Sequence, residues 1–184
     1  MSMECFLFYR LATGEIITAV TAQAKGAAAL QQPGPGMGVL VIDPGIYDLW
    51  NDESVEARAI FTDGVRSAVW EGVKAERARQ RLLPLAVSFG TLELDEASRS
   101  ALLTMATAAT AVLAIGGTMA FQVTLADNTT ADVDAEVLAQ AFAAIAARDD
   151  AQHAYSQELR GLIDDPASTL ADLLKIDFNS GWPE

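Results

Sequence analysis

Cysteine is almost absent from this sequence, and its scarcity limits the possible chemistry. Cys5 is the only cysteine among 184 residues, which excludes an intrachain disulfide and a cluster of thiolate metal ligands. Because Phe6, Leu7 and Phe8 follow it, we expect Cys5 to be a buried thiol in a strand. Histidine is equally rare. His153 lies in a polar part of a predicted helix with no nucleophile near it in sequence, which indicates a surface histidine.

Positive charge is also scarce. The chain has 12 Lys and Arg residues against 25 Asp and Glu residues, so its net charge is −13 at pH 7. Most of the excess lies between Asp127 and Glu184, where 12 acidic residues stand against 3 basic ones. An acidic surface repels phosphate groups. The composition therefore disfavours binding to nucleic acid or to an anionic membrane surface.

The N-terminus lacks the pattern of a secretory signal. Its sequence, MSMECFLFYR, has no basic region followed by a long apolar run. Hydrophobic residues make up 51% of the chain and charged residues 20%, which is typical of a globular protein. With a single cysteine, these features favour a protein that is made and kept, or assembled, in a reducing cytoplasm.

Charge of either sign is missing from Ser100–Ala126, a run of 27 residues. Its first part is rich in Ala, Leu and Met and predicts a helix that ends at Gly116-Gly117. The following residues, Met119–Leu125, alternate as a strand does. An uncharged helix needs a covering surface on most of its sides. The rest of the chain, a lipid bilayer or neighbouring copies of the chain are the three surfaces that can supply it.

The bilayer is the least favoured of the three. The predicted helix is shorter than the ~20 residues that cross ~30 Å of hydrocarbon. Acidic residues flank the run, and neither a Lys/Arg cluster nor a Trp/Tyr belt marks its ends. We therefore expect the core helix of a soluble domain, with protein on most of its sides.

The N-terminal part predicts a small β-rich domain. Cys5–Leu11 and Glu15–Val20 are expected strands around the turn Ala12–Gly14. Alternating Pro and Gly make 33–38 a loop, and Val39–Ile42 follows as a short buried strand. Further strands are expected at Tyr47–Trp50, Ala59–Phe61 and Val65–Trp70.

The C-terminal part predicts mostly helices with short β-hairpins, so the fold class is α+β. Asp95 and Asp134 are expected helix caps, the second for a helix over 135–163. The apolar residues of that helix gather at its two ends, and its polar middle, Arg148–His153, is expected in solvent between two contact surfaces. The predicted division is a β-rich module over 1–70, a linker helix over 71–84 and an α+β domain over 85–184.

The residues that could carry chemistry have simpler interpretations. A calcium loop lacks its central glycine, and Thr129 and Ala131 stand where oxygen ligands are needed. The loop over 33–38 has the wrong spacing for a dinucleotide site, and Pro35 lacks an N–H for a phosphate. The neighbouring carboxylates at 149–150 and 164–165 do not face one another on a helix. We interpret the acidic group as turn and cap residues: Asp127, Asp132, Asp134 and Glu136. We expect no catalytic residue, no cofactor and no metal, and hence no enzyme.

The order of features from Lys74 onward resembles a known family. It comprises a polar helix, the segments Val87–Gly90 and Leu94–Arg99, an Ala/Met helix, a hairpin at 126–128, a long helix and the ending Ile176–Pro183. This order is similar to an uncharacterised domain family at the C-terminal ends of tail proteins of tailed bacteriophages, described as tail-fibre-assembly-like. The resemblance covers about 110 residues, and its D-E-A-S-R and G-W-P segments are the most specific. Phe121 stands where the family usually has Trp, so an aromatic is kept.

The resemblance implies a structural component of a bacteriophage tail, at the tail tip, the baseplate or the fibre attachment region. It implies other tail proteins as partners, copies arranged in the tail's symmetry, and a location in the virion after assembly in the host cytoplasm. A tail-fibre assembly chaperone that is not retained in the virion is the alternative. Aromatic residues often anchor protein contacts. We therefore select four candidate interface residues: Trp50, Trp70, Tyr155 and Trp182.

Overall fold

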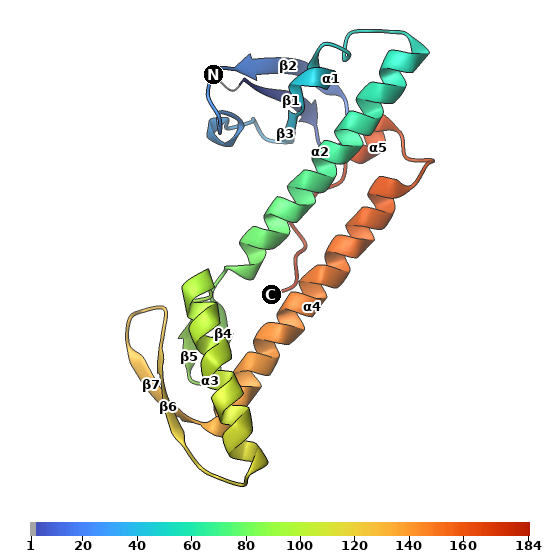
Figure 1. Cartoon of the computed structure of the whole chain (residues 1–184). Coiled ribbons are helices and arrows are strands. Elements are labelled where there is room, and N and C mark those ends of the chain that lie inside the picture. Colours follow the sequence, from blue (N-terminus) through green and yellow to red (C-terminus); the bar gives the residue numbers. More distant parts are fainter. Residues whose placement is uncertain (1–2) are drawn as a thin grey trace. The chain divides into compact units, whose positions relative to one another are not determined.

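The computed structural model describes residues 3–184 and shows a mixed α+β fold, which confirms the predicted class (Figure 1). Its internal contacts divide the chain into two compact units. The first unit comprises the chain up to Glu76 together with Ser156–Gly181. The second comprises Arg77–Tyr155 and Trp182–Glu184. Both units are therefore discontinuous in sequence, unlike the linear division expected above.

An antiparallel sheet of three strands forms one side of the first unit. Its strands are β1 (Glu4–Arg10), β2 (Ile16–Ala22) and β3 (Met37–Ile42), in the order β2-β1-β3. The predicted hairpin is confirmed, with Leu7 of β1 opposite Ala19 of β2 and Leu40 of β3. Because β1 is the central strand, consecutive residues from Cys5 to Leu7 are buried, and the expectation for Cys5 is correct.

The connection after β3 is helical rather than extended. A short 3₁₀ helix, η1 (Ala28–Leu30), precedes β3, and α1 (Pro44–Tyr47) follows it. The carboxylate of Asp43 accepts a hydrogen bond from the Gly45 N–H at 2.6 Å and caps α1. The strand expected at Tyr47–Trp50 is therefore wrong, since a capped N-terminus with Pro at the first position starts a helix.

A single long helix, α2 (Val55–Arg81), replaces the strands expected at Ala59–Phe61 and Val65–Trp70. Its buried residues recur every fourth position, which is the period of a helix face. Gly64 lies inside this helix and does not mark a turn. Its lack of a side chain leaves room for Ile46, because a Cβ at position 64 would lie 2.9 Å from the Ile46 Cγ2 atom. The predicted linker helix is the C-terminal part of α2. The buried stripe consists of Ala57, Phe61, Val65, Val69 and Val73.

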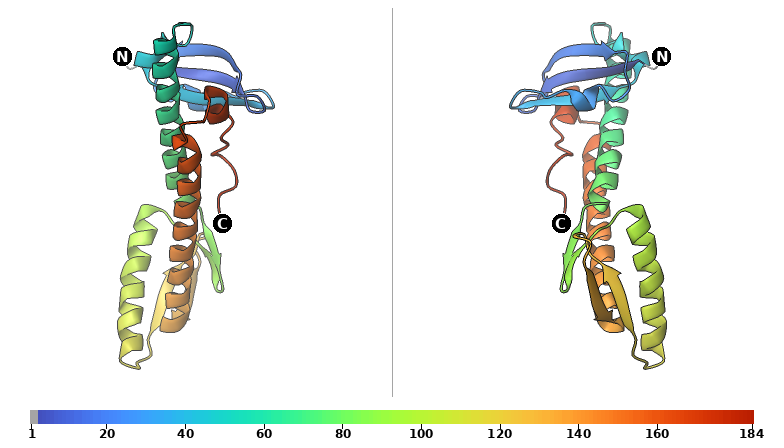
Figure 2. Two further views of the ribbon diagram at one scale, coloured as in Figure 1. Left: turned by 90° about the vertical axis from the view of Figure 1, so that its right-hand side faces the viewer. Right: turned by 90° about the vertical axis from the view of Figure 1, so that its left-hand side faces the viewer.

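The second unit contains two hairpins and a helix packed on the first half of another helix (Figure 2). The elements are β4 (Leu85–Val87), β5 (Gly90–Leu92), α3 (Glu96–Ala114), β6 (Ala120–Thr124), β7 (Thr130–Asp134) and α4 (Ala135–Asp164). Strands β4 and β5 pair antiparallel, and so do β6 and β7. One apolar cluster joins these elements, with Leu94, Leu102, Phe121 and Leu138 among its members.

Short acidic side chains start and turn these elements as predicted. Asp95 accepts a hydrogen bond from the Ser98 N–H at 2.6 Å and caps α3. Asp134 accepts one from the Val137 N–H at 2.8 Å at the start of α4. In the β6–β7 turn, Asp127 accepts from the N–H and the hydroxyl of Thr129. The roles of these carboxylates are therefore those of caps and turns.

The expected burial of the uncharged helix is wrong for the chain on its own. Only one stripe of α3 is buried, at Leu102, Ala106 and Ala109. By length and composition alone α3 is the one helix among residues 3–184 that could cross a membrane, and 17% of its most apolar window is buried. The rest of the chain thus covers only one side of this helix.

The polar middle of α4 is only partly in solvent: Asp150 and His153 are exposed as expected, whereas Arg148 and Gln152 are buried, contrary to expectation. Arg148 is 5% exposed and Gln152 is 1% exposed. They follow Leu138, Ala141 and Ile145 at helical spacing, so they continue the buried stripe with polar residues. The Arg148 guanidinium donates to the carbonyls of Pro84 and Arg81, which compensates for part of its lost hydration.

The chain ends with α5 (Leu170–Leu174) and an extended segment. Thr169 and Asp172 form a reciprocal capping box at the start of α5. Leu173 and Leu174 of α5 are fully buried. The Arg66 guanidinium of α2 also donates to the Ile163 carbonyl at the end of α4. These contacts hold Ser156–Gly181 against the N-terminal part of the first unit.

Candidate interaction surfaces

Two of the four selected aromatic residues pack on each other. The rings of Tyr155 and Trp182 lie edge to face, with centroids 5.0 Å apart and an interplanar angle of 81°. Trp182 is 9% exposed. The neighbouring Pro183 carbonyl accepts a hydrogen bond from the Gln152 side chain at 3.1 Å. Tyr155 and Trp182 therefore attach the C-terminal residues to α4 and do not form an exposed patch.

The other two aromatic residues belong to the first unit and are half-buried. The guanidinium carbon of Arg160 lies 4.7 Å from the centroid of the Trp70 ring, which is a cation–π geometry. Trp50 borders a shallow hollow together with Ile16 and Leu170. The structure thus brings Tyr155 and Trp182 together, and it places Trp50 and Trp70 elsewhere.

An ion-pair cluster joins the elements of the second unit. The Asp149 carboxylate of α4 accepts hydrogen bonds from the Arg99 guanidinium at 2.9 and 3.1 Å. It accepts two more from Arg81 at 3.0 and 3.2 Å. Burial alone would raise the pKa of Asp149, but these hydrogen bonds and the two positive charges outweigh it and lower the pKa. The cluster therefore requires an ionised carboxylate.

The substitution Asp149→Asn is expected to lower the free energy of unfolding by about 1.5–3 kcal/mol, because Arg99 loses its counter-charge in a largely buried position. Urea denaturation followed by circular dichroism measures the change. The matched control is Asp164→Asn in an exposed pair with Arg160, where we expect at most about 0.5 kcal/mol.

The same carboxylate makes stability depend on pH. The pKa of Asp149 is lower in the folded chain than in the unfolded chain. Its contribution to the free energy of unfolding is therefore fully present above the unfolded pKa of about 3.9 and is lost as the pH falls through the folded pKa. The wild-type chain should therefore lose more stability on acidification than Asp149→Asn does. Equal acid sensitivity of the two proteins would contradict this assignment.

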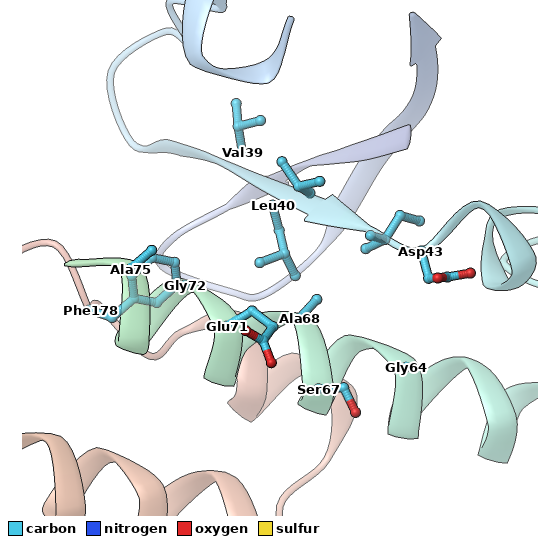
Figure 3. A pocket seen from close by; sticks show the side chains of 12 residues that line it. Val39, Leu40, Asp43, Gly64, Ser67, Ala68, Glu71, Gly72, Ala75 and Phe178 are labelled. Atoms are coloured by element: carbon cyan, nitrogen blue, oxygen red, sulfur yellow. The ribbon is translucent and has the colours of Figure 1, made fainter. Parts of the chain in front are cut away.

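An apolar groove of about 760 Å³ runs along β3 in the first unit (Figure 3). Consecutive residues from Val39 to Asp43 line one wall. Residues of α2 from Gly64 to Ala75 line the other, together with Phe178. β3 is an edge strand and pairs only with β1 among residues 3–184. The residues on the α2 wall are mostly small, which leaves the groove open.

The outward side of α3 is a second exposed surface. It carries Leu103, which is 53% exposed. Leu113 near the helix end is also exposed, but it follows Ala109 by four residues and so belongs to the stripe that is buried earlier in the helix. Thr104, Thr107 and Thr110 alternate with alanines along the helix. Each of these threonine hydroxyls donates to the carbonyl four residues earlier, at 2.8 to 3.0 Å. We call this surface, between Ser100 and Ala114, the outward face of α3.

The internal hydrogen bonds of the threonines change the character of that face. A hydroxyl that donates within its own helix leaves no unpaired donor when another surface covers it, which lowers the cost of burial. The sequence shows the absence of charge and the high content of threonine. It does not show which way the hydroxyls point, so their hydrogen bonds within the helix became visible only in the structure.

The remaining chemical candidates stay apart. His153 is exposed, and its Nδ1 lies 3.1 Å from an Arg77 guanidinium nitrogen. Within residues 3–184, no three His, Cys, Asp or Glu side chains come together as metal ligands. Burial and the carboxylates of Asp48 and Asp43 raise the pKa of the Cys5 thiol, so this thiol is protonated at neutral pH.

These features define an α+β protein of two compact units with an exposed apolar groove and an exposed uncharged helix face. The chain belongs to the family described as a domain of unknown function, DUF4376, whose model matches residues 64–179, more than half of the chain. The match begins inside α2 and ends just after Phe178. Neither the curated proteins nor the solved structures contain a match to the chain.

Proposed function

We propose that the chain is a structural component of a bacteriophage tail, at the tail tip, the baseplate or the fibre attachment region, and that it acts by packing against other tail proteins. The observation that carries the proposal is the outward face of α3. A helix side with an exposed leucine, Leu103, and no charge, on a chain of net charge −13, is a surface suited to burial against protein.

The segments that carry the family resemblance support a structural role. In D-E-A-S-R, Asp95 caps α3 and Arg99 binds Asp149. In G-W-P, Trp182 packs on Tyr155 and Pro183 accepts a hydrogen bond from Gln152. Every one of these contacts stabilises the second unit. The residues that carry the resemblance therefore stabilise the second unit. The outward face of α3 belongs to this unit.

Mass spectrometry of purified virions tests the proposal. Virions of the phage that encodes the chain should contain it in a fixed ratio to a known tail protein, and the ratio should survive a second density gradient. A soluble phage protein from the same lysate serves as the contamination control. Presence in the lysate together with loss from the purified virions would contradict the proposal and favour an assembly chaperone, which uses the same kind of surface transiently.

A further inference from the structure

We propose that the edge of β3 in the apolar groove binds an extended segment of another polypeptide, which adds to the three-stranded sheet as a further strand. The inference goes beyond the proposed function, because it concerns the first unit and does not use the outward face of α3. Three observations carry it: the direction of the backbone groups of β3, the small side chains on the α2 wall and the sign of the charge at the groove.

Hydrogen bonds beside β1 show which of its residues bond to each neighbouring strand. The Leu11 N–H, just after β1, donates to the Gly36 carbonyl on the β3 side at 2.9 Å. The Arg10 N–H donates to the Glu15 carbonyl on the β2 side, also at 2.9 Å. Backbone groups of successive strand residues point to opposite sides. Every second residue counted back from Leu11 therefore bonds to β3.

Two residues of β3 consequently direct their backbone groups into the groove. Leu40 is the partner of Leu7, which lies four residues before Leu11, so Leu40 bonds to β1. Val39 and Val41 flank it, and each directs its N–H and its carbonyl away from β1. Within residues 3–184, no hydrogen bond uses these four groups. Because consecutive residues of β3 line the groove, the groove borders the edge of the strand and not only one face.

The other edge of the sheet is partly covered by the chain itself. On β2, Ala19 points its backbone groups outward, because its partner Leu7 bonds to β3. The Tyr47 hydroxyl donates to the Ala19 carbonyl at 3.4 Å. On β3 no side chain within residues 3–184 does the same for Val39 or Val41. The strand also contains neither proline nor a charged residue, which are the usual protections of an edge.

The pattern of unpaired backbone groups identifies the occupant as an extended strand. Val39 and Val41 each offer a donor and an acceptor, two residues apart, which is the repeat along one side of a strand. A helix uses its own backbone groups internally, and an acyl chain has none to offer. The groove follows β3 from Val39 to Asp43. Five residues at about 3.4 Å each correspond to a segment about 17 Å long.

A second copy of this chain is a poorer occupant than a different polypeptide. A copy would have to present the same edge of its own β3, and its own α2 borders that edge as the other wall of the groove. Each copy also carries a net charge of −13, so two copies repel each other. A separate extended segment meets neither obstacle.

The side of the segment that faces α2 should carry large apolar side chains. A residue opposite Leu40 lies on the same side of the sheet as Leu40, which is 3% exposed. In Figure 3, Leu40 points toward α2 and Val39 points away from it. Small residues such as Ser67, Ala68 and Ala75 line the α2 wall of the groove and leave space for such side chains. Alternate apolar residues are therefore the expected pattern of the segment.

The charge at the groove disfavours an acidic segment. Asp43 and Glu71 are the charged residues that line the groove within residues 3–184, and both are acidic. The Lys74 ammonium lies 2.7 Å from the Glu71 carboxylate. Asp43 at the end of β3 has no ion pair in the described part of the chain. A lysine or arginine at the corresponding end of the segment is therefore favoured over an acidic residue.

Amide hydrogen exchange of the full chain, followed by NMR, tests the inference. In the free chain, Leu40 should exchange slowly, and Val39 and Val41 rapidly. The probe is a short acetylated and amidated peptide of alternating Val and Thr with a Lys at each end. At ten times its Kd, it should slow exchange at Val39 and Val41 by about tenfold. Slow exchange of Val39 and Val41 in the free chain, or no slowing at millimolar peptide, would overturn the inference.

Two altered peptides separate backbone pairing from contacts of the side chains. A peptide of the same sequence with methylated backbone nitrogens keeps every side chain but has no N–H to donate, so it should not slow exchange at Val39 or Val41. Equal slowing by both peptides would contradict strand addition. A peptide with Glu in place of both Lys residues should bind several-fold more weakly. Tighter binding of the Glu peptide would contradict the assigned charge preference.

Variants of the chain locate the binding. Val41→Pro removes an N–H that the sheet does not use, so the fold should remain and the affinity for the peptide should fall about tenfold. Val41→Thr keeps this N–H and should bind as the wild type does. Ala68→Phe fills the groove and should abolish binding. Ala59→Phe, at an exposed alanine of α2 outside the groove, should not.

Circular dichroism checks that all four variants are folded. Unchanged binding by both Val41→Pro and Ala68→Phe would place the peptide elsewhere and overturn the inference. Protection of Val39 and Val41 that disappears on dilution of the chain alone would identify a second copy as the occupant. Flotation with phosphatidylcholine vesicles that Ala68→Phe abolishes would identify lipid. Either result would overturn the inference, whereas virion content tests only the proposed function, so the two proposals fail separately.

Discussion

Replacement of Trp182 by alanine is expected to lower the free energy of unfolding by about 3 kcal/mol, although only two residues follow it in the sequence. The indole is almost fully buried and packs edge-on against Tyr155. Truncation of a buried aromatic leaves a cavity, and loss of the ring pair adds about 0.5–1.5 kcal/mol. The change should also release Pro183 from Gln152, whose amide would lose its acceptor.

Urea denaturation followed by circular dichroism measures this loss, and Trp182→Phe is the control. A phenylalanine ring keeps most of the contact with Tyr155, so we expect a loss of about 1 kcal/mol for Trp182→Phe. Equal losses for the two variants would show that the indole size, not the ring pair, matters here. A loss below about 0.5 kcal/mol for Trp182→Ala would contradict the packing of the C-terminal residues on α4.

Replacement of Gly14 by alanine is the second change with a large expected effect, again about 3 kcal/mol or more. Gly14 has φ of +69°, in the left-handed region, where a Cβ costs about 1–2 kcal/mol. A Cβ at this position would also lie 2.6 Å from the Ala171 Cα atom and 2.7 Å from its carbonyl carbon. Backbone atoms cannot rotate away, so α5 must shift and expose part of Leu173 and Leu174.

Gly26 provides the matched control for the backbone term. Its φ is +84°, and a Cβ there would meet no atom within 4 Å. Gly26→Ala should therefore cost only the conformational term of about 1–2 kcal/mol. The difference between the two variants measures how strongly α5 is held against the β1–β2 turn. Equal losses would mean that α5 does not contact this turn in solution.

Local chemistry predicted the second unit better than the first. Asp95, Asp127 and Asp134 act within three residues of their own positions, so their cap and turn roles could be predicted without knowledge of distant contacts. The strands expected between Ala59 and Trp70 failed for a different reason. Short apolar runs fit both the two-residue period of a strand and the 3.6-residue period of a helix. Only the recurrence of buried residues every fourth position along α2 identifies the helix.

The candidate surfaces were predicted in part. Absence of charge in Ser100–Ala126 pointed to a covered helix, but the sequence could not show that the chain itself covers only one stripe. The sequence did not predict the burial of Arg148 and Gln152. A buried helix stripe is recognised by its apolar residues, and here polar residues occupy the continuation of the stripe. Aromatic content selected Tyr155 and Trp182 as exposed anchors, whereas their pairing depends on contacts that no local pattern reveals.

The discontinuous first unit has a consequence for synthesis on the ribosome. The strands β1, β2 and β3 are synthesised early, but α5 and Phe178, which pack in the same unit, are synthesised much later. At 5–20 residues per second, the interval between Glu76 and Ser156 corresponds to roughly 4–16 s of translation. During that interval the apolar groove and the surface later covered by α5 are open to chaperones and to premature contacts between neighbouring nascent chains.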